Sequence, residues 1–313
     1  MGKTAFIFPG QGAQYIGMAM DFVKSNNELE NILNSFDDKN NTKLYKIMSE
    51  GPEEKLKETK FTQPAILFHS IAALKTVLSE IDIVPDYVAG HSLGEFSALV
   101  ANGVLTLEDA MYLVHKRGEF MIKANEGKPF AMAAIIGLSP DDVKAICEEA
   151  SKVGIVIAAN FNTPVQTVIS GSKAGVEKAC EIANEKNAKR VVPLVVGGPF
   201  HSPLIQKAAT WLSEEMNNIN FNKTTIPVVS NVSAKPTTDI DKIKNNLVEQ
   251  VTSSVLWVDS IKFMIEDGVD TFIEFGPKKV LAGMLKKIDK NVKVISIDAI
   301  ETFELIKSDL ETL

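Results

Sequence analysis

The 313-residue sequence has little cysteine, no long apolar run and no surplus of positive charge. Its two cysteines, Cys147 and Cys180, fall within predicted helices, so we expect reduced structural thiols rather than a disulfide framework. No apolar run reaches the roughly 18 residues that span a bilayer. The first apolar stretch ends at Pro9 and Gly10, too soon for a signal peptide. We therefore expect a cytoplasmic protein that does not act at a membrane.

The charge balance is acidic, with 33 Lys and Arg against 40 Asp and Glu and a net charge of −7. This balance argues against nucleic acid as a partner. The spacing of His, Cys and Asp does not match a metal site, and we expect no cofactor. Local basic clusters are either solvated surface or docking sites for an acidic protein: Lys186, Lys189 and Arg190, and Lys278, Lys279, Lys286 and Lys287.

The composition, 45% hydrophobic and 23% charged, is that of a globular protein with a sizeable core. Helices are predicted over residues 63–78, with Thr62 as N-cap, and over 107–124, with Thr106 and Asp109 at capping-box spacing. Strands alternate with helices, which predicts an α/β fold with a mostly parallel sheet covered on both faces. The predicted strands of this body are residues 4–8, 87–89, 225–230, 271–275 and 292–297.

The middle of the chain has a different order of elements, β-α-β-β-α-β, which is the ferredoxin-like arrangement. We therefore expect a large subdomain of residues 1–127 and 198–313 and an inserted ferredoxin-like subdomain of residues 128–197. The elements of the insert are a strand at 130–138, a helix from Ser139, strands at 154–159 and 166–170, a helix at 173–187 and a strand at 190–196.

A candidate nucleophile lies between a predicted strand and a predicted helix, where residues 90–94 read Gly-His-Ser-Leu-Gly. This pattern and context predict a nucleophile elbow with Ser92 at its apex. The glycines allow a strained backbone and close packing, and the following helix directs N–H groups at an oxyanion. The chemistry indicated is acyl transfer through Ser92.

Four histidines are available as the base for this serine. We expect His69 in the core, and His91 beside Ser92 in a packing or orienting role. His115 lies opposite the apolar stripe of its helix, so we expect it to be exposed. His201 follows residues 197–200, where the chain returns from the insert, and is the best base. No histidine follows it, unlike in α/β-hydrolases, so we expect a dyad oriented by a carbonyl or an amide.

Arg117 falls on the apolar face of the helix over residues 107–124. A buried guanidinium needs an anionic partner. One alternative is an internal ion pair with Asp or Glu, and the other is a substrate carboxylate held by the planar fork. The residues alone leave both open.

Weaker signals lie in two other segments. Residues 10–15 resemble a dinucleotide loop, but Tyr15 replaces its third glycine, and Gln11 could instead supply an oxyanion N–H. Asn160, Asn162 and Gln166 are either turn residues or substrate contacts.

Four motifs together, at residues 8–14, 62–65, 90–95 and 200–203, resemble those of the malonyl-CoA:acyl-carrier-protein transacylases. They read Phe-Pro-Gly-Gln-Gly-Ala-Gln, Thr-Gln-Pro-Ala, Gly-His-Ser-Leu-Gly-Glu and Phe-His-Ser-Pro. The resemblance covers essentially the whole chain and implies an α/β-hydrolase-like body with a ferredoxin-like insert. It also implies ping-pong transfer of malonyl from malonyl-CoA to the phosphopantetheine thiol of acyl carrier protein, for fatty-acid or polyketide elongation, without a cofactor.

The resemblance also assigns roles to residues, which we state as what it implies. Ser92 matches the malonylated serine and His201 its base, while Arg117 matches the arginine that holds the malonyl carboxylate. The backbone donors of the oxyanion hole correspond to Gln11 and Leu93. The remaining matches are Gln250, which orients the histidine through its main-chain carbonyl, Gln63 in the pocket, and Phe200, typical of malonyl-preferring relatives.

The chain departs from the usual family pattern at two positions beside the pocket, Pro199 and Ile205, which are not catalytic groups. Two rival functions stay open on the sequence. A thioesterase of the same fold would dispense with Arg117, whereas a non-catalytic carrier-docking module would need neither Ser92 nor His201.

Overall fold

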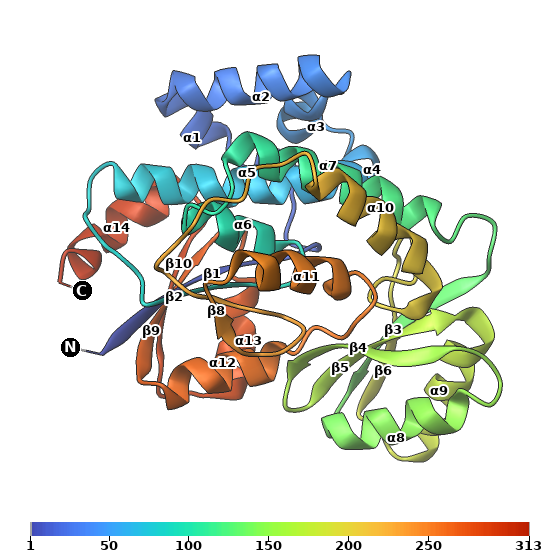
Figure 1. Cartoon of the computed structure of the whole chain (residues 1–313). Coiled ribbons are helices and arrows are strands. Elements are labelled where there is room, and N and C mark those ends of the chain that lie inside the picture. Colours follow the sequence, from blue (N-terminus) through green and yellow to red (C-terminus); the bar gives the residue numbers. More distant parts are fainter. Residues whose placement is uncertain (1, 313) are drawn as a thin grey trace.

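The computed structural model describes residues 2–312 and builds them around two separate β-sheets (Figure 1). The larger sheet has the order β10-β9-β1-β2-β7-β8, and its neighbouring strands are parallel except for the antiparallel pair β7–β8. The chain therefore has the mixed α/β architecture with a mostly parallel sheet that the sequence predicts. The strands are β1 (Lys3–Phe8), β2 (Tyr87–Gly90), β7 (Val228–Val229), β8 (Pro236–Thr237), β9 (Val269–Phe275) and β10 (Lys293–Ile297).

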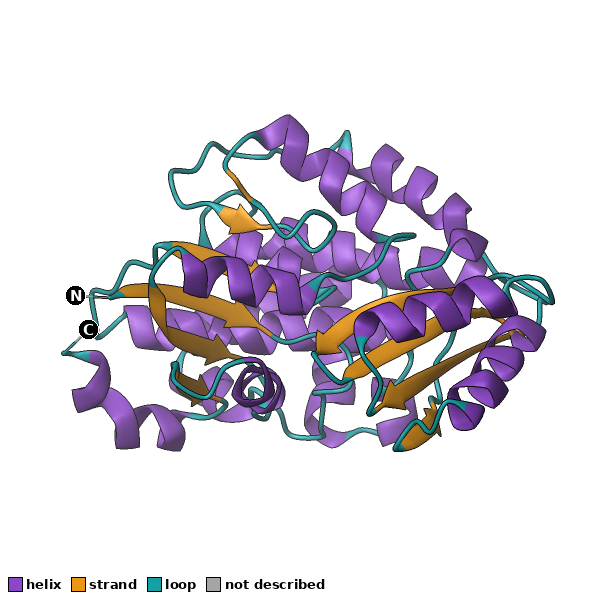
Figure 2. Ribbon diagram, turned by 90° about the horizontal axis from the view of Figure 1, so that it is seen from below, coloured by secondary structure: helices purple, strands orange, loops and turns teal. Residues whose placement is uncertain are grey.

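Both faces of this sheet are buried, because successive side chains of a strand point to opposite faces. In β1, Phe6 and Phe8 join the largest apolar core, whereas Ala5 and Ile7 join a second core on the other face. Helices from distant parts of the chain cover the two faces (Figures 1 and 2). They are α5 (Thr59–Leu78) and α6 (Gly94–Ala101) on the first face, and α12 (Trp257–Glu266) and α13 (Val280–Ile288) on the second.

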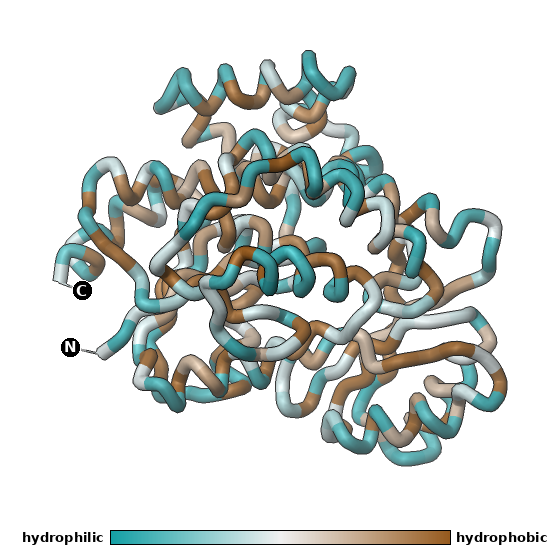
Figure 3. The backbone as a smooth tube through the Cα atoms, in the orientation of Figure 1, coloured by the Kyte–Doolittle hydropathy of each residue, from teal (hydrophilic) through white to brown (hydrophobic). Residues whose placement is uncertain are grey.

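A further helical layer lies over α5 and includes α2, whose hydropathy alternates along the tube in Figure 3. The apolar side of α2 is buried through Leu29, Ile32, Leu33 and Phe36. None of the helices within residues 2–312 is both long and apolar enough to cross a membrane. The remaining helices of the body are α1 (Met20–Ser25), α2 (Asn27–Asn40), α3 (Leu44–Glu50), α4 (Glu53–Leu56), α7 (Leu107–Lys123), α10 (Gln206–Met216), α11 (Ile240–Gln250) and α14 (Ile300–Leu310).

The predicted start of α5 is wrong, since this helix begins at Thr59 and its N-cap is Glu58 rather than Thr62. The Thr62 hydroxyl instead donates to the Leu56 carbonyl within the buried first turns. Pro64 lies inside the helix and has no N–H, which leaves the Lys60 carbonyl without its helical donor.

His115 was expected to be exposed, and this prediction is also wrong, because the side chain is 3% exposed. Its Nδ1 lies 2.9 Å from the Lys60 carbonyl oxygen, the acceptor that Pro64 frees. Phe36 of α2 packs edge-on against the imidazole, with ring centroids 5.7 Å apart. The prediction from the helical periodicity of α7 is wrong because a second helical layer covers this face, which would be exposed to solvent if α7 were considered alone.

The smaller sheet is antiparallel, with the order β4-β5-β3-β6, and its two faces have different environments. The odd-numbered Ala133, Ile135 and Ile169 join a separate core under the two helices of this unit. Even-numbered side chains such as Met132 and Val168 face the body and line a cleft. The unit contains β3 (Phe130–Ile136), α8 (Pro140–Ala150), β4 (Val156–Thr163), β5 (Gln166–Ser172), α9 (Lys173–Glu185) and β6 (Arg190–Pro193).

Backbone hydrogen bonds join the smaller sheet to the body at β4. The Val255 N–H donates to the Ala159 carbonyl at 2.8 Å, and the Phe161 N–H donates to the Val255 carbonyl at 3.0 Å. These bonds connect the smaller sheet directly to the body next to the cleft.

The packing of α5 against α7 depends on Gly118, the residue after Arg117. A Cβ at Gly118 would lie 2.8 Å from the Lys60 Cα and from the Thr59 carbonyl oxygen. Real Cβ atoms do not approach backbone this closely, so the helices meet here only because the position lacks a side chain.

We expect Gly118→Ala to destabilise the fold by about 2 kcal/mol, because the added methyl overpacks the helix crossing. The matched control is Gly283→Ala in α13, where an added Cβ meets no atom within 4 Å. Alanine is the better helix former, so the control should be stabilised by about 0.5–1 kcal/mol. Urea unfolding of both variants measures the difference, and equal free energies of unfolding would contradict this account of the crossing.

Candidate active site

Ser92 sits in a sharp turn between β2 and α6 with a left-handed φ of 54°. The flanking glycines permit this turn. A Cβ at Gly90 would lie 1.9 Å from the Gly94 carbonyl carbon, and one at Gly94 would lie 2.2 Å from the Phe8 carbonyl oxygen. A non-glycine residue in this conformation stores about 1–3 kcal/mol of strain, which the surroundings must hold.

Asn231, in the loop after β7, clamps this turn from both sides. Its Oδ1 accepts from the Ser92 N–H at 2.7 Å, and its Nδ2 donates to the Gly90 carbonyl at 2.7 Å. The side chain is fully buried. Sequence reasoning missed Asn231, since it belongs to no motif and lies 139 positions from Ser92.

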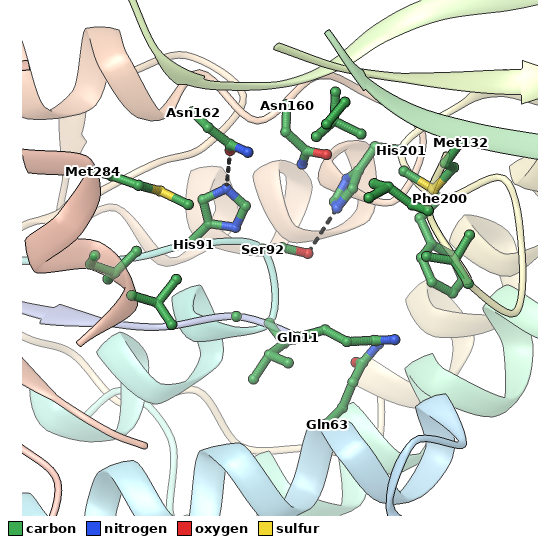
Figure 4. A pocket seen from close by; sticks show the side chains of 18 of the residues that line it. Gln11, Gln63, His91, Ser92, Met132, Asn160, Asn162, Phe200, His201 and Met284 are labelled. Carbon is green, nitrogen blue, oxygen red and sulfur yellow. Dashed lines mark hydrogen bonds between the residues drawn. The ribbon is translucent and has the colours of Figure 1, made fainter. Parts of the chain in front are cut away.

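The structure brings His201 against Ser92, with the imidazole Nε2 2.8 Å from the serine Oγ (Figure 4). The other ring nitrogen, Nδ1, lies 2.8 Å from the Gln250 main-chain carbonyl, which can only accept. Nδ1 therefore carries the proton and Nε2 is free to accept the serine proton. Burial, and next the charge of Arg117, lower the pKa of His201 to about 3, so the imidazole is neutral at physiological pH.

Arg117 is buried beside the same serine, and its partners are neutral. Nη2 donates to the Ser92 Oγ at 3.0 Å and to the Gln250 Oε1 at 2.9 Å, while Nη1 donates to the Gln63 Oε1 at 2.8 Å. Within the described chain, no carboxylate oxygen lies within 4.0 Å of the guanidinium, so the internal ion pair is not formed. Burial lowers the pKa of Arg117 to about 10, which still leaves it charged at neutral pH.

The Gln250 side chain connects Arg117 to a buried carboxylate. Its Nε2 donates to the Glu95 Oε2 at 2.7 Å and to the Ser92 carbonyl at 3.0 Å. Burial raises the pKa of Glu95 to about 7. The sequence contains Glu95 within the motif around Ser92, but nothing in that pattern indicates where its side chain goes.

His69 and His91, like the buried His115, do not bond to the Ser92 hydroxyl. His69 is fully buried, as predicted, with its Nε2 3.3 Å from Asp298. His91 lies in the pocket wall, and its Nε2 is 2.8 Å from the Asn162 Oδ1 of β4 (Figure 4).

A cavity of about 280 Å³ opens over Ser92 between the body and the smaller sheet (Figure 4). Asn160, Asn162 and Gln166 lie in strands and line this cavity, so they are not turn residues. Most of the side chains that the sequence singled out also line it: Gln11, Gln63, Ser92, Leu93, Arg117, Phe200 and His201. Gln250 is not among the lining residues and contacts the cavity through Arg117, which donates to its Oε1.

Two backbone N–H groups beside the cavity are available to a ligand. In residues 2–312, the N–H groups of Gln11 and Leu93 have no hydrogen-bond acceptor. Gln11 follows β1, and Leu93 directly precedes α6, whose N-terminus carries a partial positive charge. The arrangement as a whole suits attack of a serine on an acyl carbon.

Comparison with known proteins extends this picture to the whole chain. The sequence model of the family described as "Acyl transferase domain" matches residues 5–304. The chain is 45% identical over 306 residues to the malonyl CoA-acyl carrier protein transacylase of Bacillus subtilis, covering 97% of this chain and 96% of that protein.

Solved structures are similar to the same extent. An acyl-carrier-protein S-malonyltransferase from Burkholderia pseudomallei aligns with a TM-score of 0.93 at 40% identity, over 99% of each chain. A malonyl-transacylase in complex with its type II PKS acyl-carrier protein aligns with a TM-score of 0.93 at 35% identity, over 98% of this chain and 99% of that chain.

A sulfonyl fluoride should modify Ser92, and His201→Asn should slow the reaction by about 100-fold, because it removes the base. The wild-type rate should persist from pH 8 down to about pH 5, since a base with a pKa of about 3 stays unprotonated there. If the base had the ordinary histidine pKa of about 6.5, the modification rate would instead fall nearly tenfold for each pH unit below that value. Intact-mass time courses measure the rate, and modification of Ser92→Ala at the wild-type rate would refute the assignment.

Proposed function

The chain belongs to the acyl transferase domain family, and on this premise we propose that it moves malonyl from malonyl-CoA to acyl carrier protein through an ester on Ser92. One observation supports malonyl as the acyl group. The Arg117 guanidinium is buried on neutral partners and lies 3.0 Å from the nucleophile oxygen. A short acyl group on Ser92 that ends in a carboxylate supplies the anion that the protein does not place there.

The first half-reaction begins with the Ser92 hydroxyl hydrogen-bonded to His201. As the serine oxygen attacks the thioester carbon, its proton passes to His201 Nε2. The C–S bond then breaks, and the proton on His201 goes to the leaving thiolate of CoA. The Gln250 carbonyl stabilises the imidazolium that forms in between, since it accepts from Nδ1.

The second half-reaction repeats these steps with the phosphopantetheine thiol of the carrier protein. His201 takes the thiol proton, the thiolate attacks the malonyl ester, and the serine oxygen recovers the proton as the C–O bond breaks. In both halves the Gln11 and Leu93 N–H groups hold the oxyanion. These steps use side chains and backbone of this chain alone.

The pocket supports a preference for an unbranched malonyl group. Phe200 precedes the base and is 8% exposed, so its ring fills space beside the reacting carbon. Gln63 orients Arg117 from α5 through its Oε1. A branch on the acyl chain would have to displace the Phe200 ring.

We also propose the finer description of the fold: an α/β-hydrolase-like body of residues 1–127 and 198–313 with a ferredoxin-like insert of residues 128–197. The order β3-α8-β4-β5-α9-β6 and the sheet order β4-β5-β3-β6 support the second part. The apolar core of the insert, built almost wholly from its own residues, supports the boundaries.

The carrier protein and the compartment are proposed on charge and thiol chemistry. An acidic carrier protein would dock on the exposed basic clusters around Arg190 and Lys286. Cys147 and Cys180 are free thiols, which fits a reducing cytoplasm.

Ser92→Ala should abolish covalent labelling by malonyl-CoA, because among residues 2–312 no other serine bonds to both His201 and Arg117. Intact-mass spectrometry after mixing shows the malonyl adduct directly. Ser97→Ala, at a buried serine of α6, the helix that follows Ser92, is the matched control and should label like the wild type. A malonyl adduct that survives in Ser92→Ala would overturn the proposed function.

Arg117→Ala should lower kcat/KM for malonyl-CoA by about 10- to 100-fold, the equivalent of one charged hydrogen bond of about 1.5–3 kcal/mol. Acetyl-CoA has no carboxylate, so its kcat/KM should change much less. The control Lys116→Ala removes a positive charge from the neighbouring position of α7 and should keep the malonyl preference. An equal loss for both thioesters would show that Arg117 does not bind the carboxylate.

A further inference from the structure

Two buried groups of opposite charge stand on either side of one amide. Glu95 Oε2 accepts from Gln250 Nε2 at 2.7 Å, and Gln250 Oε1 accepts from Arg117 Nη2 at 2.9 Å. Both ionisable side chains are at most 2% exposed. The mechanism uses Arg117 and Gln250 but gives no task to Glu95.

The amide between the charges leaves the guanidinium available to a substrate. A direct ion pair would have to break before a substrate carboxylate could bind, at a cost of several kcal/mol for each stranded charge. Here Nη1 and Nη2 of Arg117 donate to neutral oxygens of Gln63, Ser92 and Gln250. The compensating negative charge is nearby but does not occupy the binding position.

The arrival of a malonyl carboxylate changes the balance of charge in this buried region. The free site contains one positive charge on Arg117 and one negative charge on Glu95. The substrate adds a second negative charge, and an uncompensated anion is costly away from water. Protonation of Glu95 restores neutrality without moving any atom of the Arg117 clamp.

We propose that Glu95 is the internal counter-charge of Arg117, relayed by the Gln250 amide, and that it takes up a proton when malonyl binds. It is a positioning residue that sets specificity through electrostatics, because it touches neither the substrate nor the reacting atoms. This inference rests on the proposed malonyl transfer and deepens it. The proton comes from solvent and returns to solvent when the malonyl group leaves.

The titration range of the neighbouring groups supports this proposal. Burial raises the pKa of Glu95 to about 7. The charged group that acts on Glu95 is Arg117, and the titratable His201 and His91 line the adjoining cavity. Arg117 stays protonated, and burial keeps the pKa values of both histidines below the ordinary range. Between pH 6 and 8.5, Glu95 is therefore the group of this site that changes charge.

The sign of the pH dependence follows from the charge balance. Below pH 7 Glu95 is neutral and the free site attracts a carboxylate, whereas above pH 7 malonyl binding must draw a proton onto Glu95. The ratio of kcat/KM for malonyl-CoA to that for acetyl-CoA should therefore fall as pH rises above 7, by up to tenfold per pH unit. Taking the ratio cancels ionisations of CoA and of the dyad, which both thioesters share.

The experiment measures this ratio from pH 6 to 8.5 in the wild type and in Glu95→Gln, Glu95→Asp and Glu249→Gln. In Glu95→Gln the malonyl-to-acetyl ratio should not change with pH and should equal or exceed the wild-type ratio at pH 6. In Glu95→Asp the ratio should again fall with rising pH, as in the wild type. Glu249 is exposed and adjacent to Gln250, so Glu249→Gln makes the same charge change outside the site and should keep the slope.

A flat ratio in the wild type would overturn the proposal, and this test needs no variant to fold. A wild-type slope that persists in Glu95→Gln would overturn it as well. Failure of the underlying function looks different, because malonyl-CoA would then leave no ester on Ser92 at any pH.

Discussion

The burial of the Arg117 charge next to the Ser92 hydroxyl is the constraint on which the rest of the site depends. Removing a guanidinium from water is costly unless its N–H groups are satisfied. The protein gives its two terminal nitrogens, Nη1 and Nη2, acceptor oxygens from separate parts of the chain: Gln63 on α5, Gln250 on α11, and Ser92. The helices must therefore be placed accurately, and the Gly118 crossing places α7 against α5.

One of these helices, α11, also contacts His201. Gln250 supports Arg117 with its side chain and His201 with its main-chain carbonyl, so one residue positions both the guanidinium and the imidazole beside Ser92. Ser92 and His201 both have left-handed backbone conformations, with φ of 54° and 57°. Asn231 and Gln250 hold the strained serine turn by hydrogen bonds to its backbone. Strain near the reacting atoms is tolerated because buried polar partners offset it.

The parallel sheet explains why these groups meet where they do. Gln11 follows β1, and Ser92 follows β2, its neighbour in the sheet. The carboxyl ends of adjacent parallel strands lie at one edge, which is where ligands bind in open α/β sheets. The smaller sheet lies on the other side of the cleft with the face that carries Met132 and Val168, and the bonds at Val255 join it to the body.

The sequence by itself determined the features that depend on neighbours along the chain. These are the strand and helix alternation, the glycine turn around Ser92, the Thr106 cap of α7 and the apolar face that carries Arg117. Local patterns reveal them because backbone geometry and helical periodicity act over a few residues. The same patterns failed for Thr62, where an internal proline was compatible with an earlier helix start, and for His115, where a second helical layer covers the expected surface.

Only the tertiary structure decided which partners the polar groups have. The Ser92 turn is clamped by Asn231 from 139 positions away, and Arg117 meets Gln250 from 133 positions away. It also decided that Glu95 faces Gln250 rather than the arginine, which leaves the guanidinium available to a substrate. Contacts of this kind depend on how buried helices and loops from distant segments pack together. The spacing of residues along the chain does not predict that packing.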